Sequence, residues 1–96
     1  MLITSKPEYA LFILQALSNL SNANLDELME RTFNLIEDRL YPADYKLLPN
    51  GVLRWRNQSE FMLEGLIEND YIEKYGEKYV LTSKGMSYLE KYYTPL

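Results

Sequence analysis

The chain has 96 residues, and neither cysteine nor histidine is among them. Without cysteine there is no disulfide framework, no thiolate nucleophile and no zinc–thiolate site. Without histidine the commonest general base and transition-metal ligand is also missing. The triplet Asp44-Tyr45-Lys46 has the form of half a nuclease metal site, but it falls in an expected loop without a second acidic ligand. The sequence therefore predicts that the protein is not an enzyme and has no catalytic residue, metal or cofactor.

Long hydrophobic runs are also missing. The longest apolar stretch covers residues 9–14, whereas about 20 residues are needed to span a bilayer. Residues 1–8 do not combine a basic start with an apolar run, so they do not resemble a signal peptide. We expect a soluble, cytoplasmic protein with no membrane partner.

The composition is that of an ordinary globular protein, with 47% hydrophobic and 25% charged residues. The length predicts a single domain over residues 1–96. Ten basic residues oppose fourteen acidic ones, which gives a net charge of -4. This balance excludes a uniformly basic coat for nucleic acid but leaves room for a local basic patch.

Two helices are expected in the first half of the chain. The pairs Ser5–Glu8 and Asn24–Glu27 have the spacing of capping boxes, and apolar residues recur behind each pair with helical periodicity. The first helix is broken by the Ser- and Asn-rich residues 18–24. The second reaches about Leu40, because Tyr41–Pro42 forces the backbone out of the helical region.

The second half begins with a connector over residues 43–51 that contains the turn signal Pro49-Asn50-Gly51. A third capping box, Asn57–Glu60, predicts that the third helix runs from about Gln58 to Asn69. Trp55, just before this helix, is expected to anchor the turn against the core.

Residues 71–81 alternate β-branched and aromatic side chains around Gly76, which predicts a β-hairpin. Thr82 is then expected to cap a last helix, which Gly85 in its first turn should weaken. The residues that this helix is expected to bury are Met86 and Leu89.

This order of elements predicts an α+β, mainly helical fold, a winged helix-turn-helix. It consists of three helices, a two-stranded wing hairpin and a C-terminal helix. A lone hairpin is marginally stable, so the wing must pack on the helices. In such folds the third helix commonly enters the major groove of DNA while the wing lies along the adjacent backbone.

The charges are unevenly distributed around the expected third helix. Residues 46–58 hold three basic and no acidic side chains, next to a helix start whose unpaired amides favour anions. Lys74 and Lys78 flank the wing turn. Double-stranded DNA is therefore the first partner to consider, and the candidate DNA-binding residues are Lys46, Arg54, Arg56, Asn57, Gln58, Ser59, Lys74 and Lys78.

An acidic stripe leads to a second interpretation. Glu60, Glu64 and Glu68 share one face of the third helix and would repel phosphate. Only the neutral strip beside them (Gln58, Phe61 and Gly65) could then read bases. The alternative function is a winged-helix adaptor for a protein partner, or an acidic inhibitor that imitates DNA and does not bind it. Exposed tyrosines near the C-terminus, such as Tyr92 and Tyr93, could line a homodimer contact.

Residues 51–72, Gly-Val-Leu-Arg-Trp-Arg-Asn-Gln-Ser-Glu-Phe-Met-Leu-Glu-Gly-Leu-Ile-Glu-Asn-Asp-Tyr-Ile, are similar to the N-terminal winged-helix domain of Mrr-type restriction endonucleases. That family has a glycine, an aromatic–basic–Asn–Arg motif, a second aromatic and a leucine near the helix end. Leu81-Thr82-Ser83-Lys84-Gly85 resembles the family's Leu-Thr-x-x-Gly after the wing. The positions that match the first motif are Trp55, Arg56, Asn57, Phe61 and Leu66.

The resemblance covers about half the chain and implies DNA binding, in a regulator or in the target-recognition module of a defence or restriction-type system. The chain departs from the family pattern at two positions. Gln58 replaces an arginine and Asp70 replaces a glycine. The family's nuclease domain is absent from these 96 residues, so the resemblance implies recognition without cleavage.

Overall fold

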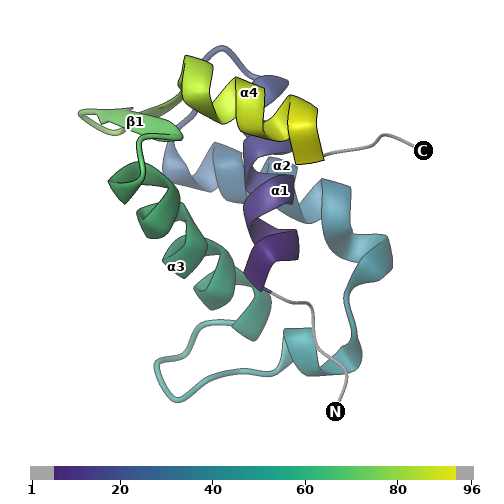
Figure 1. Ribbon diagram of the computed structural model, residues 1–96. Coiled ribbons are helices and arrows are strands. Elements are labelled where there is room, and N and C mark those ends of the chain that lie inside the picture. The colour runs from purple at the N-terminus through teal and green to yellow at the C-terminus, as the bar shows by residue number, and fades with distance from the viewer. Residues whose placement is uncertain (1–5, 93–96) are drawn as a thin grey trace.

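The first helix, α1 (Lys6–Ser18), runs through the middle of the molecule (Figure 1). The computed structural model describes residues 6–92, so Ser5 of the first expected capping box and Tyr93 lie outside the described part. Around α1 pack three further helices: α2 (Leu25–Ile36), α3 (Arg54–Glu68) and α4 (Ser83–Tyr92). Because helices surround it, α1 buries more than the one apolar stripe expected, including Tyr9 and Leu14.

The start of α2 is built as the sequence predicts. Asn24 Oδ1 accepts a hydrogen bond from the Glu27 backbone N–H (2.8 Å), and Glu27 Oε1 accepts one from the Asn24 N–H (3.2 Å). The expected extension to Leu40 is wrong. The α-helix ends at Ile36 and tightens into a 3₁₀ turn, η1 (Glu37–Arg39), which is a common way for a helix to end.

The connector between η1 and α3 contains a second 3₁₀ turn, η2 (Pro42–Tyr45), followed by an isolated antiparallel bridge between Leu47 and Leu53. Directly after this bridge α3 begins at Arg54, three residues before Asn57. The expected helix start at Gln58 and the capping box Asn57–Glu60 are therefore wrong, because the Asn57 N–H already donates to the Leu53 carbonyl oxygen (3.0 Å) inside the helix.

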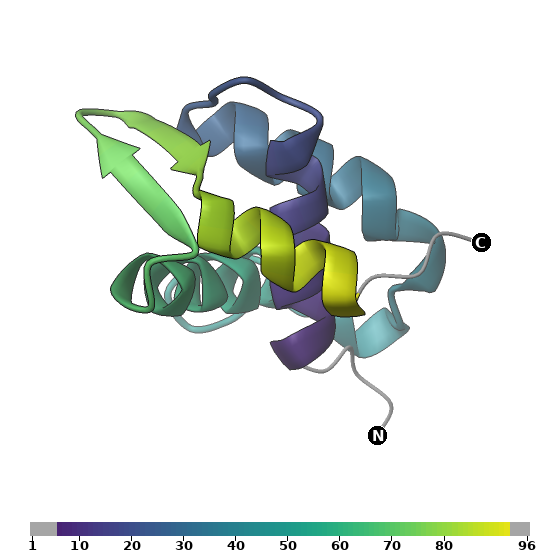
Figure 2. The ribbon, with the colours of Figure 1, turned by 45° about the horizontal axis from the view of Figure 1, so that its top comes forward.

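The hairpin follows α3, as expected. Its strands β1 (Ile72–Tyr75) and β2 (Lys78–Leu81) are antiparallel, with Ile72 opposite Leu81 and Tyr75 opposite Lys78. Ala23, in the loop before α2, makes a short bridge to Tyr79 of β2 through two backbone hydrogen bonds. The hairpin projects from the helices at the carboxyl end of α3 (Figure 2). The described residues thus form an α+β, mainly helical structure with a hairpin after three helices.

The last helix starts as predicted, because Thr82 Oγ1 accepts a hydrogen bond from the Gly85 N–H (2.9 Å). Leu89 is buried, but the expected burial of Met86 is wrong, since its side chain is 40% exposed. Gly85 is buried against the start of the hairpin, where a Cβ atom would lie 2.2 Å from the Tyr71 carbonyl oxygen. Glycine is therefore needed at this position for close packing, despite its low helix propensity.

Replacement of Asp70 by glycine should stabilise the protein by about 0.5–1 kcal/mol. Asp70 follows the C-terminal end of α3 with φ 65°, the left-handed conformation in which a side chain is strained. Thermal unfolding of Asp70→Gly, followed by circular dichroism, measures the gain. The control Asp70→Ala should be less stable than the wild type, because alanine has the same strain and lacks a polar side chain to offset it. A Gly variant less stable than the Ala variant would contradict this explanation.

Candidate interaction surface

The first turn of α3 carries three of the residues that the sequence singles out. Trp55 is 8% exposed, and its ring centroid lies 4.9 Å from that of Phe33 on α2. The expectation that Trp55 anchors this region to the core is confirmed. Arg54 and Arg56 lie on either side of it, within the helix rather than before it.

Arg56 joins α3 to the amino end of α2. Its Nη2 lies 3.0 Å from Asp26 Oδ1, and its Nε lies 3.4 Å from Glu60 Oε1. The hydrogen bond to Asp26 raises the pKa of the Arg56 guanidinium above its usual value, so the side chain stays cationic. Two carboxylates already share this charge, which leaves it less available to phosphate.

Lys46 and Arg54 differ from Arg56, because neither forms an ion pair with a residue in the range 6–92. Lys46 is exposed and Arg54 is half-buried. The Arg54 N–H donates to the Lys46 carbonyl oxygen (2.8 Å), so the backbone holds these two cations close together beside the start of α3.

The other candidates on α3 are not equally accessible. Asn57 Oδ1 accepts a hydrogen bond from Asn50 Nδ2 (3.1 Å), and Gln58 is half-buried. The prediction that Ser59 binds DNA is wrong, because its side chain is fully buried and cannot reach a nucleic acid. Phe61, one position from Glu60 in the chain, is 61% exposed and stands at the surface.

The hairpin lysines lie near acidic or aromatic groups. Lys78 Nζ is 3.5 Å from Glu27 Oε1 on α2, and Lys74 Nζ is 5.6 Å from the ring centroid of Tyr79. Both lysines therefore already have a contact within their own chain. Lys78 therefore ties the hairpin to the amino end of α2 by charge as well as by the bridge at Ala23.

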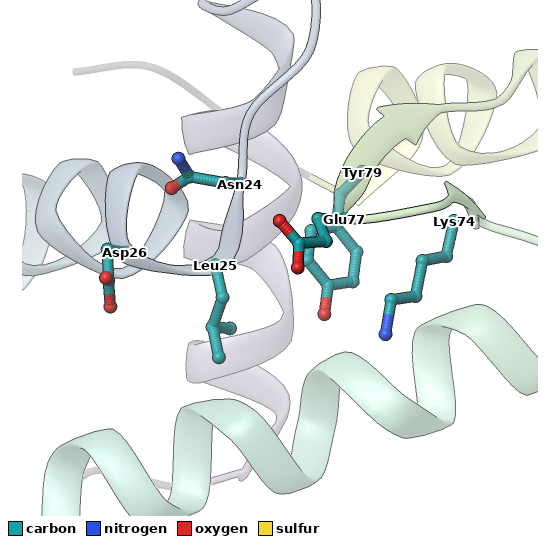
Figure 3. A pocket seen from close by; sticks show the side chains of 6 residues that line it. All are labelled: Asn24, Leu25, Asp26, Lys74, Glu77 and Tyr79. Atoms are coloured by element: carbon teal, nitrogen blue, oxygen red, sulfur yellow. The ribbon is translucent and has the colours of Figure 1, made fainter.

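Two adjoining pockets of about 350 and 460 Å³ lie between the amino end of α2, the hairpin and α3. Both are lined by Leu25 and Tyr79. In Figure 3 the side chains of Leu25 and Lys74 project from their separate elements toward α3. We call this surface the concave face. Its lining residues are Asn24, Leu25, Asp26, Asn57, Glu60, Phe61, Leu63, Glu64, Lys74, Glu77 and Tyr79.

The concave face is acidic. Four carboxylates (Asp26, Glu60, Glu64 and Glu77) oppose one lysine, Lys74, so its lining carries a net charge of 1 − 4 = −3. The net charge of the concave face stays negative even when Arg56, which bonds to Asp26 and Glu60, is included in the count. Leu25, Phe61 and Leu63 add apolar side chains to the lining, so the concave face suits a ligand with a hydrophobic part and a positive charge.

Sequence reasoning missed part of this surface. The sequence pattern places Glu27 only in the capping box of α2, and it predicts neither the ion pair of Glu27 with Lys78 nor that of Asp26 with Arg56. The signal for Asp26 in the sequence is its position in the first turn of a capped helix, where its side chain is exposed.

The described residues offer neither a metal site nor a membrane-spanning helix. Within residues 6–92, no group of three acidic side chains is placed to hold a metal ion. Asp44, from the half-nuclease triplet, is fully buried and bonds to the Tyr9 hydroxyl and the Tyr41 N–H, so it does not face solvent with Lys46. No helix in the described part of the chain has the length and apolar character needed to cross a membrane.

No protein-family model matches this chain, and no curated protein and no solved structure was found to be significantly similar to it.

Proposed function

We propose that this protein is a winged helix-turn-helix module whose concave face binds a cationic, partly apolar segment of a protein. The order of helices and hairpin supports the fold assignment, as does the resemblance of residues 51–72 to Mrr-type N-terminal domains. In winged helices the exposed face of the third helix is the usual binding surface. Here that face carries Glu60, Phe61 and Glu64.

The pairing of Arg56 is the observation that carries the proposal. Duplex DNA presents about one negative charge per 1.7 Å of its axis, so a DNA-binding surface must supply unneutralised cations. Arg56, which contacts the concave face, is instead shared by Asp26 and Glu60, and the lining of this face is net negative. A basic partner segment gains from these carboxylates, while exposed Phe61 offers it an apolar contact.

Replacement of Arg56 by alanine distinguishes a cationic protein partner from DNA, because the affinities for these two ligands should change in opposite directions. Loss of the cation makes the concave face more negative. The affinity for a fluorescein-labelled amphipathic peptide of leucine and lysine should rise about threefold at ~20 mM salt. Fluorescence anisotropy measures this change. The matched control is Arg31→Ala, which removes one exposed arginine on α2, outside the concave face, and should change the affinity less.

DNA binding stays a second proposal, because Lys46 and Arg54 lie together at the start of α3 and form no ion pair with a described residue. The same titration with a 20-base-pair duplex tests it. If DNA is the ligand, the wild type binds the duplex and Arg56→Ala weakens binding. Removing Lys46 and Arg54 would then lower the log–log salt slope by about 1 per lost phosphate contact. This result, with no peptide bound, would refute the first proposal.

A further inference from the structure

The connector between η2 and α3 exposes a pair of leucines. Leu47 is 63% exposed and Leu53 is 39% exposed. They face each other across an isolated antiparallel bridge, which is flanked on each side by one backbone hydrogen bond. In this pattern the bridged residues form the non-hydrogen-bonded kind of pair, whose side chains lie close together on one side of the ribbon. Leu47 and Leu53 thus form one apolar knob on what we call the connector hairpin, residues 46–54.

The charge of the connector hairpin is opposite to that of the concave face. Lys46 and Arg54 lie directly beside the two leucines in the chain, and no acidic residue occurs between positions 45 and 59. The connector hairpin is therefore a cationic segment with an apolar knob. This is the chemistry that the concave face is proposed to bind.

We infer that the partner of the concave face is the connector hairpin of a second copy of this chain. The inference rests on the proposed function, since it names the segment that the concave face receives. Leu47 and Leu53 would lie against the apolar part of the larger pocket, near Phe61. The basic residues beside the leucines would meet the carboxylates of the concave face, which are Glu60 and Glu64 in the larger pocket and Glu77 in the smaller one.

The placement of the two surfaces allows a closed dimer. Asn50, at the turn of the connector hairpin, donates a hydrogen bond to Asn57, which lines the concave face, so the two surfaces lie side by side on one molecule. A two-fold axis near this point puts each hairpin into the other copy's concave face, and the two contacts form together. A hairpin-to-hairpin dimer would instead place Lys46 and Arg54 of the two copies against each other, and like charges oppose such a contact.

A charge-swap experiment tests this arrangement. The groove variant is Glu64→Lys/Glu77→Lys, and the hairpin variant is Lys46→Glu/Arg54→Glu. In the structure these four side chains form no ion pair with a described residue, so the fold should tolerate the changes. A control, Glu30→Lys/Glu37→Lys, changes the net charge as the groove variant does but on exposed positions outside the concave face.

The expected results are distinctive. In sedimentation velocity the wild type and the control should reach twice the chain mass of 11.4 kDa as concentration rises. Each double variant alone should dimerise at least about 10-fold more weakly, because like charges then face each other at both contacts. An equimolar mixture of the two variants should recover the dimer, since every contact in the mixed pair again joins opposite charges. Recovery also demonstrates that both variants are folded.

Two results would overturn the inference. One is a wild type that stays monomeric at ~1 mM, and the other is a dimer that neither double variant weakens. The leucine–lysine peptide then distinguishes the two proposals. If the peptide still binds and Glu64→Lys/Glu77→Lys weakens it, the proposed function stands and only the identity of the partner is wrong. If the peptide also fails to bind, the proposed function has failed with it.

Discussion

Gly85→Ala should destabilise the protein by about 3 kcal/mol. An alanine Cβ at this position would lie 2.2 Å from the Tyr71 carbonyl oxygen and 2.7 Å from Leu81 Cδ1. The Tyr71 oxygen cannot move away easily, because it accepts hydrogen bonds from the Thr82 N–H and hydroxyl. The clash must therefore push α4 away from the start of the hairpin. A loss of this size should lower the midpoint of thermal unfolding by about 4–8 °C per kcal/mol in a domain of this length.

Gly65→Ala is the matched control, since Gly65 also lies in a helix but a Cβ there meets no atom within 4 Å. Alanine at this position should stabilise α3 by about 0.5–1 kcal/mol through its higher helix propensity. Circular dichroism at 222 nm, recorded during heating, measures both variants. Opposite shifts support the close contact at Gly85, whereas equal shifts would mean that only helix propensity distinguishes the two glycines.

The different roles of these glycines illustrate which features a sequence can predict. The capping box at Asn24–Glu27, the hairpin turn at Gly76 and the cap at Thr82 each depend on groups a few residues apart, and each is present in the structure. The need for glycine at position 85 depends on the backbone of Tyr71, in a different element. Propensity alone therefore predicted a weak point where the structure has a close contact.

The candidate surface shows even more strongly that local features can be predicted from the sequence and contacts between distant elements cannot. The basic residues around the start of α3 were recognisable from their spacing, as was the glutamate stripe. Their pairing was not, because Arg56 meets Asp26 from thirty positions earlier in the chain. The start of α3 was misplaced for a similar reason, since the bridge between Leu47 and Leu53 determines where the helix begins. Ser59 faces inward once this register is set.

Asp44→Ala should cost a further large part of the stability, about 3 kcal/mol. The Asp44 carboxylate is fully buried. Its Oδ1 accepts a hydrogen bond from the Tyr9 hydroxyl of α1 (2.9 Å), and its Oδ2 accepts one from the Tyr41 N–H (2.8 Å). Alanine removes the acceptor of two donors at once and separates the connector from α1. Urea unfolding followed by the fluorescence of Trp55, the single tryptophan, measures the loss.

A double-mutant cycle shows whether the loss arises at the proposed contact. Tyr9→Phe alone should cost about 1–2 kcal/mol, because the buried carboxylate loses one donor while the ring still packs. Once Asp44 is alanine, removal of the hydroxyl should cost much less, since its acceptor is already gone. Additive losses would contradict the contact. Because Asp44 holds η2 at the base of the connector hairpin, Asp44→Ala should also weaken the self-association that depends on Leu47 and Leu53, even under conditions where the core remains folded.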